Sequence, residues 1–323
     1  MSRRVRPRFE RTVGWMQPGA AVAALRLNCR TMDSRAARTS LENRRADGGG
    51  RAGWLARSLA VVALFALAAA AVVPAHAQSR AESRAPAPAV AAASDLQFAL
   101  PEIAADFERA TGRRVRLAFG SSGNFRRQIA EGAPFEIFLS ADESFVQALA
   151  AEGRTVDGGT LYAIGRLVLF AAAGSPLVPD AALADLRAAL ADGRVKKLAI
   201  ANPEHAPYGR AAREALQRTG LWDAAQPKLV LGENVSQAAQ FAVGGAAQGG
   251  IFAYSLALSP AIAERGRHVL LPAELHAPLA QRMVLLQRAG DDARTFYAYL
   301  QTPAARAVLR RHGFALPGEA GAP

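Results

Sequence analysis

Two short stretches of this sequence decide its interpretation: Ala-Ala-Ala-Ser-Asp at residues 91–95 and Phe-Gly-Ser-Ser-Gly-Asn at residues 119–124. Each follows a short apolar or β-branched run and opens a segment with helical periodicity. The start of a helix offers unpaired backbone N–H groups and the positive end of the helix dipole, and a Ser hydroxyl adds one more donor. Two such starts favour a site for a small anion that needs neither Lys nor Arg.

The sequence around these stretches alternates between the periodicities of strands and helices. Helical stretches such as residues 96–111 place apolar side chains on one face. The alternation predicts an α/β fold with mostly parallel strands and helices on both faces of the sheet. Ligands of such open sheets bind beyond the carboxyl ends of the strands, where Ser94 and Ser122 are expected. The β-like runs are residues 115–119, 135–139, 166–170, 197–200, 228–231 and 281–286.

Residues 51–77 have the pattern of a signal peptide. Arg51 and Arg57 precede an apolar run that ends at Pro74, and Ala-His-Ala at residues 75–77 supplies a small-x-small cleavage site. The apolar run is short for a bilayer span of roughly 20 residues, which is the competing interpretation. We therefore expect cleavage before Gln78 and a periplasmic protein.

The segments outside the predicted domain differ from it in composition. Residues 1–50 are rich in Arg, Gly and Ala and lack clear periodicity, which indicates a misassigned translation start or a disordered leader. Residues 78–89 are rich in Ala, Pro and Ser and predict a flexible lead-in. Residues 317–323 are expected to form a short tail.

The leader also accounts for most of the formal net charge of +12. Residues 1–77 hold 13 Arg and 4 acidic residues, which leaves 26 basic and 23 acidic residues in the rest of the chain. A net charge of +3 does not indicate nucleic-acid binding. The one cysteine, Cys29, lies in the removed part, so the mature chain has no disulfide, thiol nucleophile or thiolate metal site.

Several further motifs make the sequence recognisable. From about residue 90 to residue 316, the chain resembles the periplasmic molybdate-binding proteins of ABC-type uptake systems. The resemblance rests on Ala-Ala-Ala-Ser at 91–94, Phe-Gly-Ser-Ser-Gly at 119–123, Gln-Ile-Ala-Glu-Gly-Ala-Pro at 128–134, Leu-Ser-Ala-Asp at 139–142, Asn-Pro-Glu-His-Ala-Pro-Tyr-Gly at 202–209, Gly-Glu-Asn-Val at 232–235 and Arg-His-Gly-Phe at 311–314.

The resemblance implies a two-lobed periplasmic binding protein fold. Each lobe is expected to be a mostly parallel sheet flanked by helices, and two crossing strands join the lobes. The first lobe is expected at residues 90–165 plus 286–316 and the second at residues 166–285. Closure about residues 166–169 and 281–285 would hold one tetrahedral dianion in the cleft and present a surface to a membrane permease.

Four site residues follow from the resemblance. Ser94 and Ser122 match serines that contact the oxyanion, and Tyr208 and Val235 match backbone N–H donors of the second lobe. The implied function is capture of molybdate, and also of tungstate, by a monomeric binding protein. The resemblance implies neither catalysis nor a cofactor, and no bare metal cation.

Two positions depart from the family pattern. Many relatives carry a tyrosine where this chain has Ala253, and Tyr254 follows one residue later, so a hydroxyl donor is moved or lost unless Tyr208 supplies it. An ionised Asp95 beside Ser94 would repel a dianion by roughly 1 kcal/mol per charge at 4 Å in water. We expect Asp95 to cap its helix and point away; the alternatives are a protonated carboxyl or another anion.

Two alternative functions remain. Asp95 keeps open a binding protein for sulfate, thiosulfate or phosphate, since it would accept a hydrogen bond from hydrogen phosphate. A secreted hydrolase would use Ser94 or Ser122 as nucleophile and His205 as base. The hydrolase lacks support, because residues 120–123 are one residue short of a G-x-S-x-G elbow.

Overall fold

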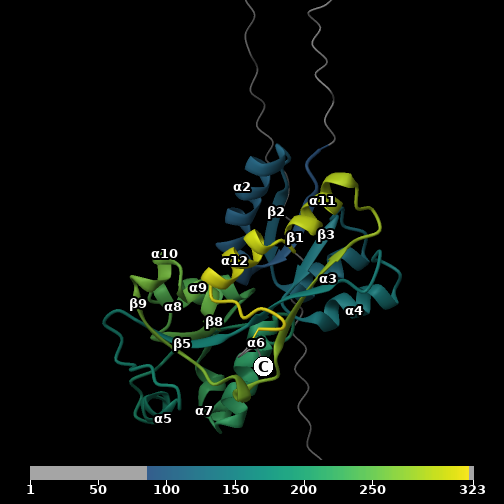
Figure 1. Cartoon of the computed structure of the whole chain (residues 1–323). Coiled ribbons are helices and arrows are strands. Elements are labelled where there is room, and N and C mark those ends of the chain that lie inside the picture. The colour runs from purple at the N-terminus through teal and green to yellow at the C-terminus, as the bar shows by residue number, and fades with distance from the viewer. Residues whose placement is uncertain (1–85, 320–323) are drawn as a thin grey trace, which may run out of the picture. The chain divides into compact units, whose positions relative to one another are not determined.

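The structure, a computed structural model, describes residues 86–319. The predicted leader, the signal peptide, residues 78–85 of the lead-in and residues 320–323 of the tail lie outside the described residues. Within them are two five-stranded sheets flanked by helices (Figure 1). This confirms the predicted two-lobed α/β fold, and we call the parts around the two sheets the first and second lobes. No helix within residues 86–319 is long and apolar enough to cross a membrane.

The two sheets share one strand pattern. Three neighbouring strands are parallel, and each of the two strands that follow is antiparallel to the strand before it. The first sheet has the order β2 (Arg116–Gly120), β1 (Ala89–Ala93), β3 (Ile137–Ser140), β10 (Leu279–Leu285) and β4 (Thr160–Gly165). The second has the order β7 (Leu229–Gly232), β6 (Leu198–Ala201), β8 (Gly249–Ala253), β5 (Leu167–Ala172) and β9 (Gly266–Leu270).

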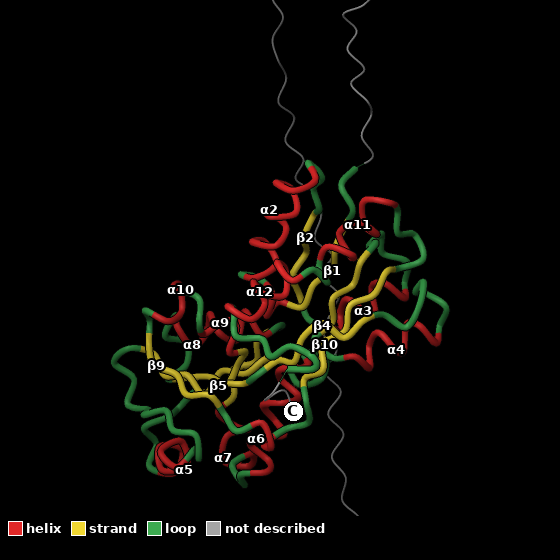
Figure 2. Tube along the Cα trace, in the orientation of Figure 1, coloured by secondary structure: helices red, strands yellow, loops and turns green. Residues whose placement is uncertain are grey.

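Each sheet is mixed, but four of its five strands run in one direction and only β10 in the first sheet and β5 in the second run opposite to them, which agrees with the expectation of mostly parallel strands. The reason for the two exceptions lies in the two chain crossings. β4 ends at Gly165 and β5 begins at Leu167, and β10 begins directly opposite the end of β4 (Figure 2). Strands that begin at this edge must run away from it, so β5 and β10 are antiparallel to their neighbours.

The register of β10 corrects the expected lobe boundary. β10 pairs with β3 and β4, so residues 279–285 belong to the first sheet and not to a second lobe that extends to residue 285. The second crossing is therefore the segment 271–278, and the strand pairs of residues 281–285 lie inside the first lobe. An apolar run predicts a strand but not the partner of that strand, which is why residues 279–285 were expected in the second lobe.

Helices cover both faces of the first sheet. One apolar cluster joins the sheet to α2, α11 and α12, and another joins it to α3 and α4. In the second lobe one cluster joins the sheet to α6 and α8. The helices of the first lobe are α2 (Ala99–Thr111), α3 (Ser122–Ala130), α4 (Glu143–Ala151), α11 (Asp291–Tyr299) and α12 (Pro303–Arg311). Those of the second lobe are α5 (Ala184–Ala191), α6 (Pro207–Arg218), α7 (Trp222–Ala225), α8 (Val235–Val243), α9 (Tyr254–Ala257) and α10 (Pro260–Ala263). The single-turn 3-10 helices are η1 (Ser94–Leu96), η2 (Gln226–Lys228) and η3 (Ala273–Leu275).

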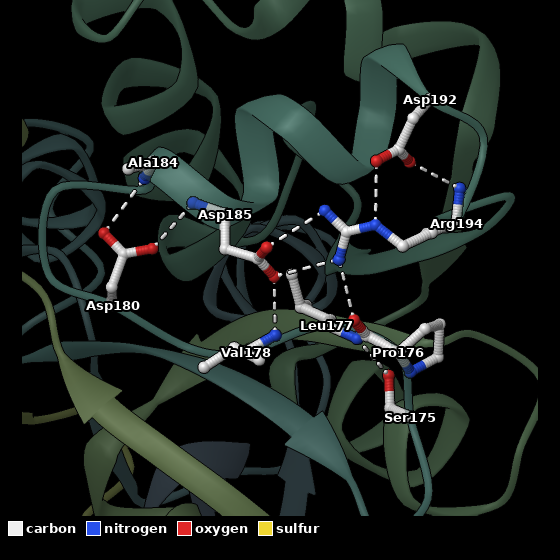
Figure 3. Close-up of polar contacts among 9 residues, drawn as sticks. All are labelled: Ser175, Pro176, Leu177, Val178, Asp180, Ala184, Asp185, Asp192 and Arg194. Carbon is white, nitrogen blue, oxygen red and sulfur yellow. Dashed lines mark hydrogen bonds and ion pairs between the residues drawn. The ribbon is translucent and has the colours of Figure 1, made fainter.

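Side chains fix the loop that leads into α5. Asp180 accepts hydrogen bonds from the backbone N–H groups of Ala184 and Asp185, both at 2.9 Å, and so caps this helix. Arg194 then bridges the carboxylates of Asp185 and Asp192 (Figure 3). These contacts hold the segment 180–194 together without involving the edge at which the two lobes meet.

Candidate functional site

A small pocket lies where the carboxyl ends of the strands of both lobes meet. Its cavity volume is about 10 Å³, roughly the space of one water-sized sphere and far below the roughly 300 Å³ at which pockets for drug-sized ligands begin. Among the described residues that line it, none is Lys or Arg. The lining residues are Ala93, Ser94, Asp95, Gly120, Ser121, Ser122, Ala141, Ala206, Pro207, Tyr208 and Val235. The four predicted site residues and Asp95 are thus brought together.

Local sequence explains why helices begin at this pocket. Ser121 is the N-cap of α3, and its side chain accepts from the N–H of Asn124. Asn234 is the N-cap of α8, and its side chain accepts from the N–H of Gln237. Pro207 opens α6, where its missing N–H and fixed φ suit the first helical position.

An accounting of the first-turn N–H groups identifies the free donors. In α3 the third N–H is bound to the cap, and the N–H of Gly123 donates to the carbonyl of His205 at 3.0 Å. In α8 the third N–H is likewise bound to the cap, and the N–H of Ser236 donates to Ser94 Oγ at 3.3 Å. Within the described part of the chain, the first-turn N–H groups that keep no partner in these two helices are those of Ser122 and Val235.

The same accounting applies to α6. Pro207 has no N–H, and the N–H of Gly209 donates to the carbonyl of Ala206 at 3.0 Å. The N–H of Tyr208 is left between them. Three backbone donors from three helix starts therefore border one pocket, two of them from the second lobe.

The hydroxyls of Ser94 and Ser122 are oriented as donors. Ser122 Oγ accepts from the N–H of Ala141 at 3.0 Å, and Ser94 Oγ accepts from the N–H of Ser236 at 3.3 Å. Both serines are buried. Because a backbone N–H already occupies an acceptor position on each oxygen, the hydroxyl hydrogen is free to point to a ligand.

Asp95 does not cap its helix, so that expectation was wrong. Ala93 occupies the N-cap position of η1, and no side-chain cap is formed. The carboxylate instead accepts from Tyr208 Oη at 3.0 Å and from Gln281 Nε2 at 2.6 Å, both on Oδ2. Burial raises the pKa of Asp95 to about 6, although the hydrogen bonds from Gln281 and Tyr208, and the nearby backbone N–H groups of Asp95 and Leu96, partly offset the shift.

Neither of the two tyrosines considered as hydroxyl donors directs its hydroxyl to a ligand in the pocket. The Tyr208 hydroxyl donates to Asp95, so only its backbone N–H is directed to a ligand. The ring of Tyr254 lies 5.8 Å from that of His268, and Tyr254 does not line the pocket. Its neighbour Ser255 has a role that the sequence did not reveal, since its Oγ donates to the backbone oxygen of Asp95 at 2.9 Å.

Sequence reasoning also missed Gln281 and Tyr162. Gln281 is fully buried in β10, and its Oε1 accepts from Tyr162 Oη at 2.7 Å. This bond turns the amide nitrogen of Gln281 toward Asp95. A single amide side chain in a strand whose other residues, apart from Arg282, are apolar was the available signal, since a buried amide needs partners.

Further contacts join the lobes around the pocket. Ser121 Oγ lies 3.0 Å from His205 Nδ1, and hydrogen bonds join Asn124 to Glu233 and Ser236 to Gln97. His205 therefore contacts Ser121 and neither of the serines considered as nucleophiles. No group of three or more His, Cys, Asp or Glu that could hold a metal ion occurs within residues 86–319.

Comparisons with known proteins agree with this geometry. Residues 88–315 match the family described as bacterial extracellular solute-binding protein. The molybdate-binding protein ModA of Rhodobacter capsulatus is 40% identical over 216 residues, 66% of this chain and 82% of that relative. ModA of Azotobacter vinelandii is 38% identical over 230 residues, 70% of this chain and 89% of that relative. The solved periplasmic molybdate-binding protein of Azotobacter vinelandii aligns with a TM-score of 0.65 and 33% identity, covering 71% of this chain and 99% of the other.

Proposed function

Because this chain belongs to the bacterial extracellular solute-binding protein family, we propose that it captures one molybdate ion in the pocket between its lobes. The observation that carries the proposal is the set of unused donors at that pocket. The hydroxyls of Ser94 and Ser122 and the backbone N–H groups of Ser122, Tyr208 and Val235 surround a space without Lys or Arg among the described lining residues. Relatives named as molybdate-binding proteins support the choice of anion.

The mechanism is recognition by neutral donors. A tetrahedral dianion presents four oxygens that only accept hydrogen bonds, and the helix starts of α3, α6 and α8 also offset its charge. Molybdate has longer metal–oxygen bonds than the bonds of sulfate or phosphate. A rigid set of donors spaced for the larger ion therefore binds the smaller ions less well, and tungstate, with similar dimensions, is expected to bind beside molybdate.

The proposal extends to the cellular role. The protein would work in the periplasm after cleavage before Gln78 and pass the anion to the permease of an ABC transporter as a monomer. The two chain crossings, at Arg166 and at residues 271–278, allow the lobes to separate and release the ion. We also propose that the protein does not turn over a substrate, because Ser121, the serine in contact with His205, caps α3 with the same oxygen.

Titration calorimetry with the purified protein tests the function. Molybdate and tungstate are expected to bind with one ion per chain, whereas sulfate and phosphate give little heat, because the donor spacing suits the larger ions. A panel of ester substrates serves as the control for catalysis and is expected to remain unhydrolysed. Preferential binding of sulfate or phosphate, or no binding of any of the four anions, contradicts the proposal.

Removing either serine hydroxyl is expected to weaken molybdate binding. Ser94→Ala and Ser122→Ala each leave an anion oxygen without a donor, which costs about 1–3 kcal/mol, or a factor of roughly 5 to 150 in affinity. Ser144→Ala is the matched control, since Ser144 is exposed on α4 and bonds only to Asp142. Affinities of all three variants equal to wild type would show that the donors lie elsewhere.

A further inference from the structure

Asp95 has one carboxyl oxygen that the structure does not use. The residue lines the pocket and is 1% exposed. Both side-chain donors within reach, Tyr208 Oη and Gln281 Nε2, bind to Oδ2. Oδ1 is buried and has no hydrogen-bond partner among residues 86–319. A buried polar atom without a partner is rare in folded proteins, and here it occurs at the edge of the proposed anion site.

The surroundings hold the carboxyl group in place. The Tyr162 hydroxyl orients the amide of Gln281, whose nitrogen also lies 3.1 Å from Tyr208 Oη. Ser255 Oγ fixes the backbone of Asp95 through its carbonyl oxygen. Because two donors hold Oδ2, the carboxyl cannot exchange its two oxygens without breaking buried hydrogen bonds. Oδ1 is therefore the oxygen available to a ligand.

An ionised Oδ1 and an anion oxygen are both acceptors, so they cannot form a hydrogen bond with each other. A proton on Oδ1 changes this, because the carboxyl then donates. We propose that Asp95 takes up one proton from solvent as the oxyanion binds, and that its Oδ1–H group donates to an oxygen of the anion. The inference rests on the proposed function and makes Asp95 a further residue that contacts the bound oxyanion.

The groups that face Asp95 permit this protonation. Tyr208 from α6 and Tyr162 from β4 stay neutral, since burial and the nearby Asp95 carboxylate raise the pKa of both phenols. The remaining groups are Gln281 from β10, Ser255 from α9 and the backbone N–H groups of Asp95 and Leu96, none of which titrates. The carboxylate therefore has no cationic partner among these contacts that would hold it in the charged form.

One other titratable pair lies next to Ser121, which lines the pocket. His205 contacts Ser121, and its Nε2 lies 3.5 Å from a carboxylate oxygen of Glu233. Protonation of His205 would also favour an anion, so an experiment must separate the two residues. The side chain of His205 pairs with Ser121 and Glu233, whereas the carboxyl of Asp95 pairs with Tyr208 and Gln281, which allows each residue to be changed without the other.

The expected pH dependence of molybdate affinity follows from the burial of Asp95 and from the charge of the bound anion. Burial, partly offset by hydrogen bonds to the carboxylate, brings the pKa of Asp95 to about 6 in the free protein, and a dianion beside the carboxyl raises it further. Between these two pKa values the free protein carries an ionised Asp95 and the complex a protonated one. Molybdate affinity is thus expected to fall as pH rises above 6, by at most tenfold per pH unit.

Titration calorimetry of the whole protein with molybdate, in buffers of different ionisation enthalpy, measures the protons taken up. We expect uptake approaching one proton per ion between pH 7 and pH 7.5 for the wild type. His205→Asn should keep this uptake, and Asp95→Asn should still bind molybdate with no uptake. If Asp95→Asn does not fold, Tyr208→Phe replaces it as the test variant. Loss of a hydrogen bond to the ionised carboxyl should move the uptake in that variant to higher pH.

The outcomes separate this inference from the proposed function. Tight molybdate binding by the wild type without proton uptake overturns the role of Asp95 and leaves the function standing. Uptake that persists in Asp95→Asn but disappears in His205→Asn also overturns it and assigns the proton to His205. Absence of molybdate binding at every pH between 5 and 8 overturns the proposed function, and this inference with it.

Discussion

Replacement of Gly123 by alanine is expected to lower molybdate affinity about a hundredfold or more while both lobes stay folded. A Cβ atom at this position would lie 2.6 Å from the backbone oxygen of His205 and 3.1 Å from its Cα. Those atoms belong to the other lobe and to backbone just before α6, so they cannot turn aside. Alanine favours the helix in which Gly123 lies, so α3 itself should persist.

The size of the effect follows from the donors that depend on closure. If the lobes cannot approach, the N–H groups of Tyr208 and Val235 no longer reach an anion held by the first lobe. A hydrogen bond to a charged group contributes about 1.5–3 kcal/mol, so losing two costs at least about 3 kcal/mol, which is roughly a hundredfold in affinity. Gly158→Ala is the matched control, since a Cβ there meets nothing within 4 Å. Equal affinities of the two variants in calorimetry would disprove the closure argument.

Stability is expected to fall as pH rises from 4 to 6, through the buried carboxyl of Asp95. The folded pKa of about 6 lies above the ordinary value of 3.8, so in this window the native state binds more protons than the unfolded state. The Asp95 contribution is therefore fully present below pH 3.8 and lost as pH rises through 6. The loss amounts to roughly 3 kcal/mol, since one pKa unit corresponds to about 1.4 kcal/mol.

Other carboxyls act in the opposite direction, so Asp95 must be isolated by difference. The pKa of Glu102 and that of Asp185 are lowered, by hydrogen bonds from His312 and Arg194 respectively, which favours the native state at higher pH. Urea unfolding measures the free energy of unfolding of wild type and of Asp95→Asn at each pH from 4 to 8. The difference between the two values cancels the contributions of the carboxyls that both proteins share. The stability of the variant relative to wild type should rise by roughly 3 kcal/mol between pH 4 and pH 7. Parallel profiles would mean that Asp95 titrates normally.

Local patterns in the sequence were sufficient for the strands and for the helix starts at the site. Six apolar runs correspond to strands whose ends differ by two residues at most. Helix α2 ends at Gly112 with φ of 68°, as its position after the helical stretch suggests. Ser122 and Val235 follow cap residues, Ser121 and Asn234, and these caps depend only on neighbours within three residues.

The features that could not be predicted from the sequence depend on contacts between residues far apart in the chain. Asp95 was expected to cap a helix because aspartate often does so near a helix start. Its actual partners, Tyr208 and Gln281, lie 113 and 186 residues away in the chain. Tyr254 has the right residue type near the right place, but its ring packs toward His268. Local periodicity carries no information on such pairings, and the lobe to which β10 belongs was missed for the same reason.

The position of β10 has a consequence for the order in which the protein acquires its structure. The strands of the second lobe, residues 167–270, are continuous in sequence, so this lobe is complete once that stretch is available. In the first lobe β10 lies between β3 and β4, and β4 pairs with β10 alone. The half of the protein that begins first along the chain is therefore finished last. Until the C-terminal segment arrives, β3 keeps an open edge that can pair with other chains.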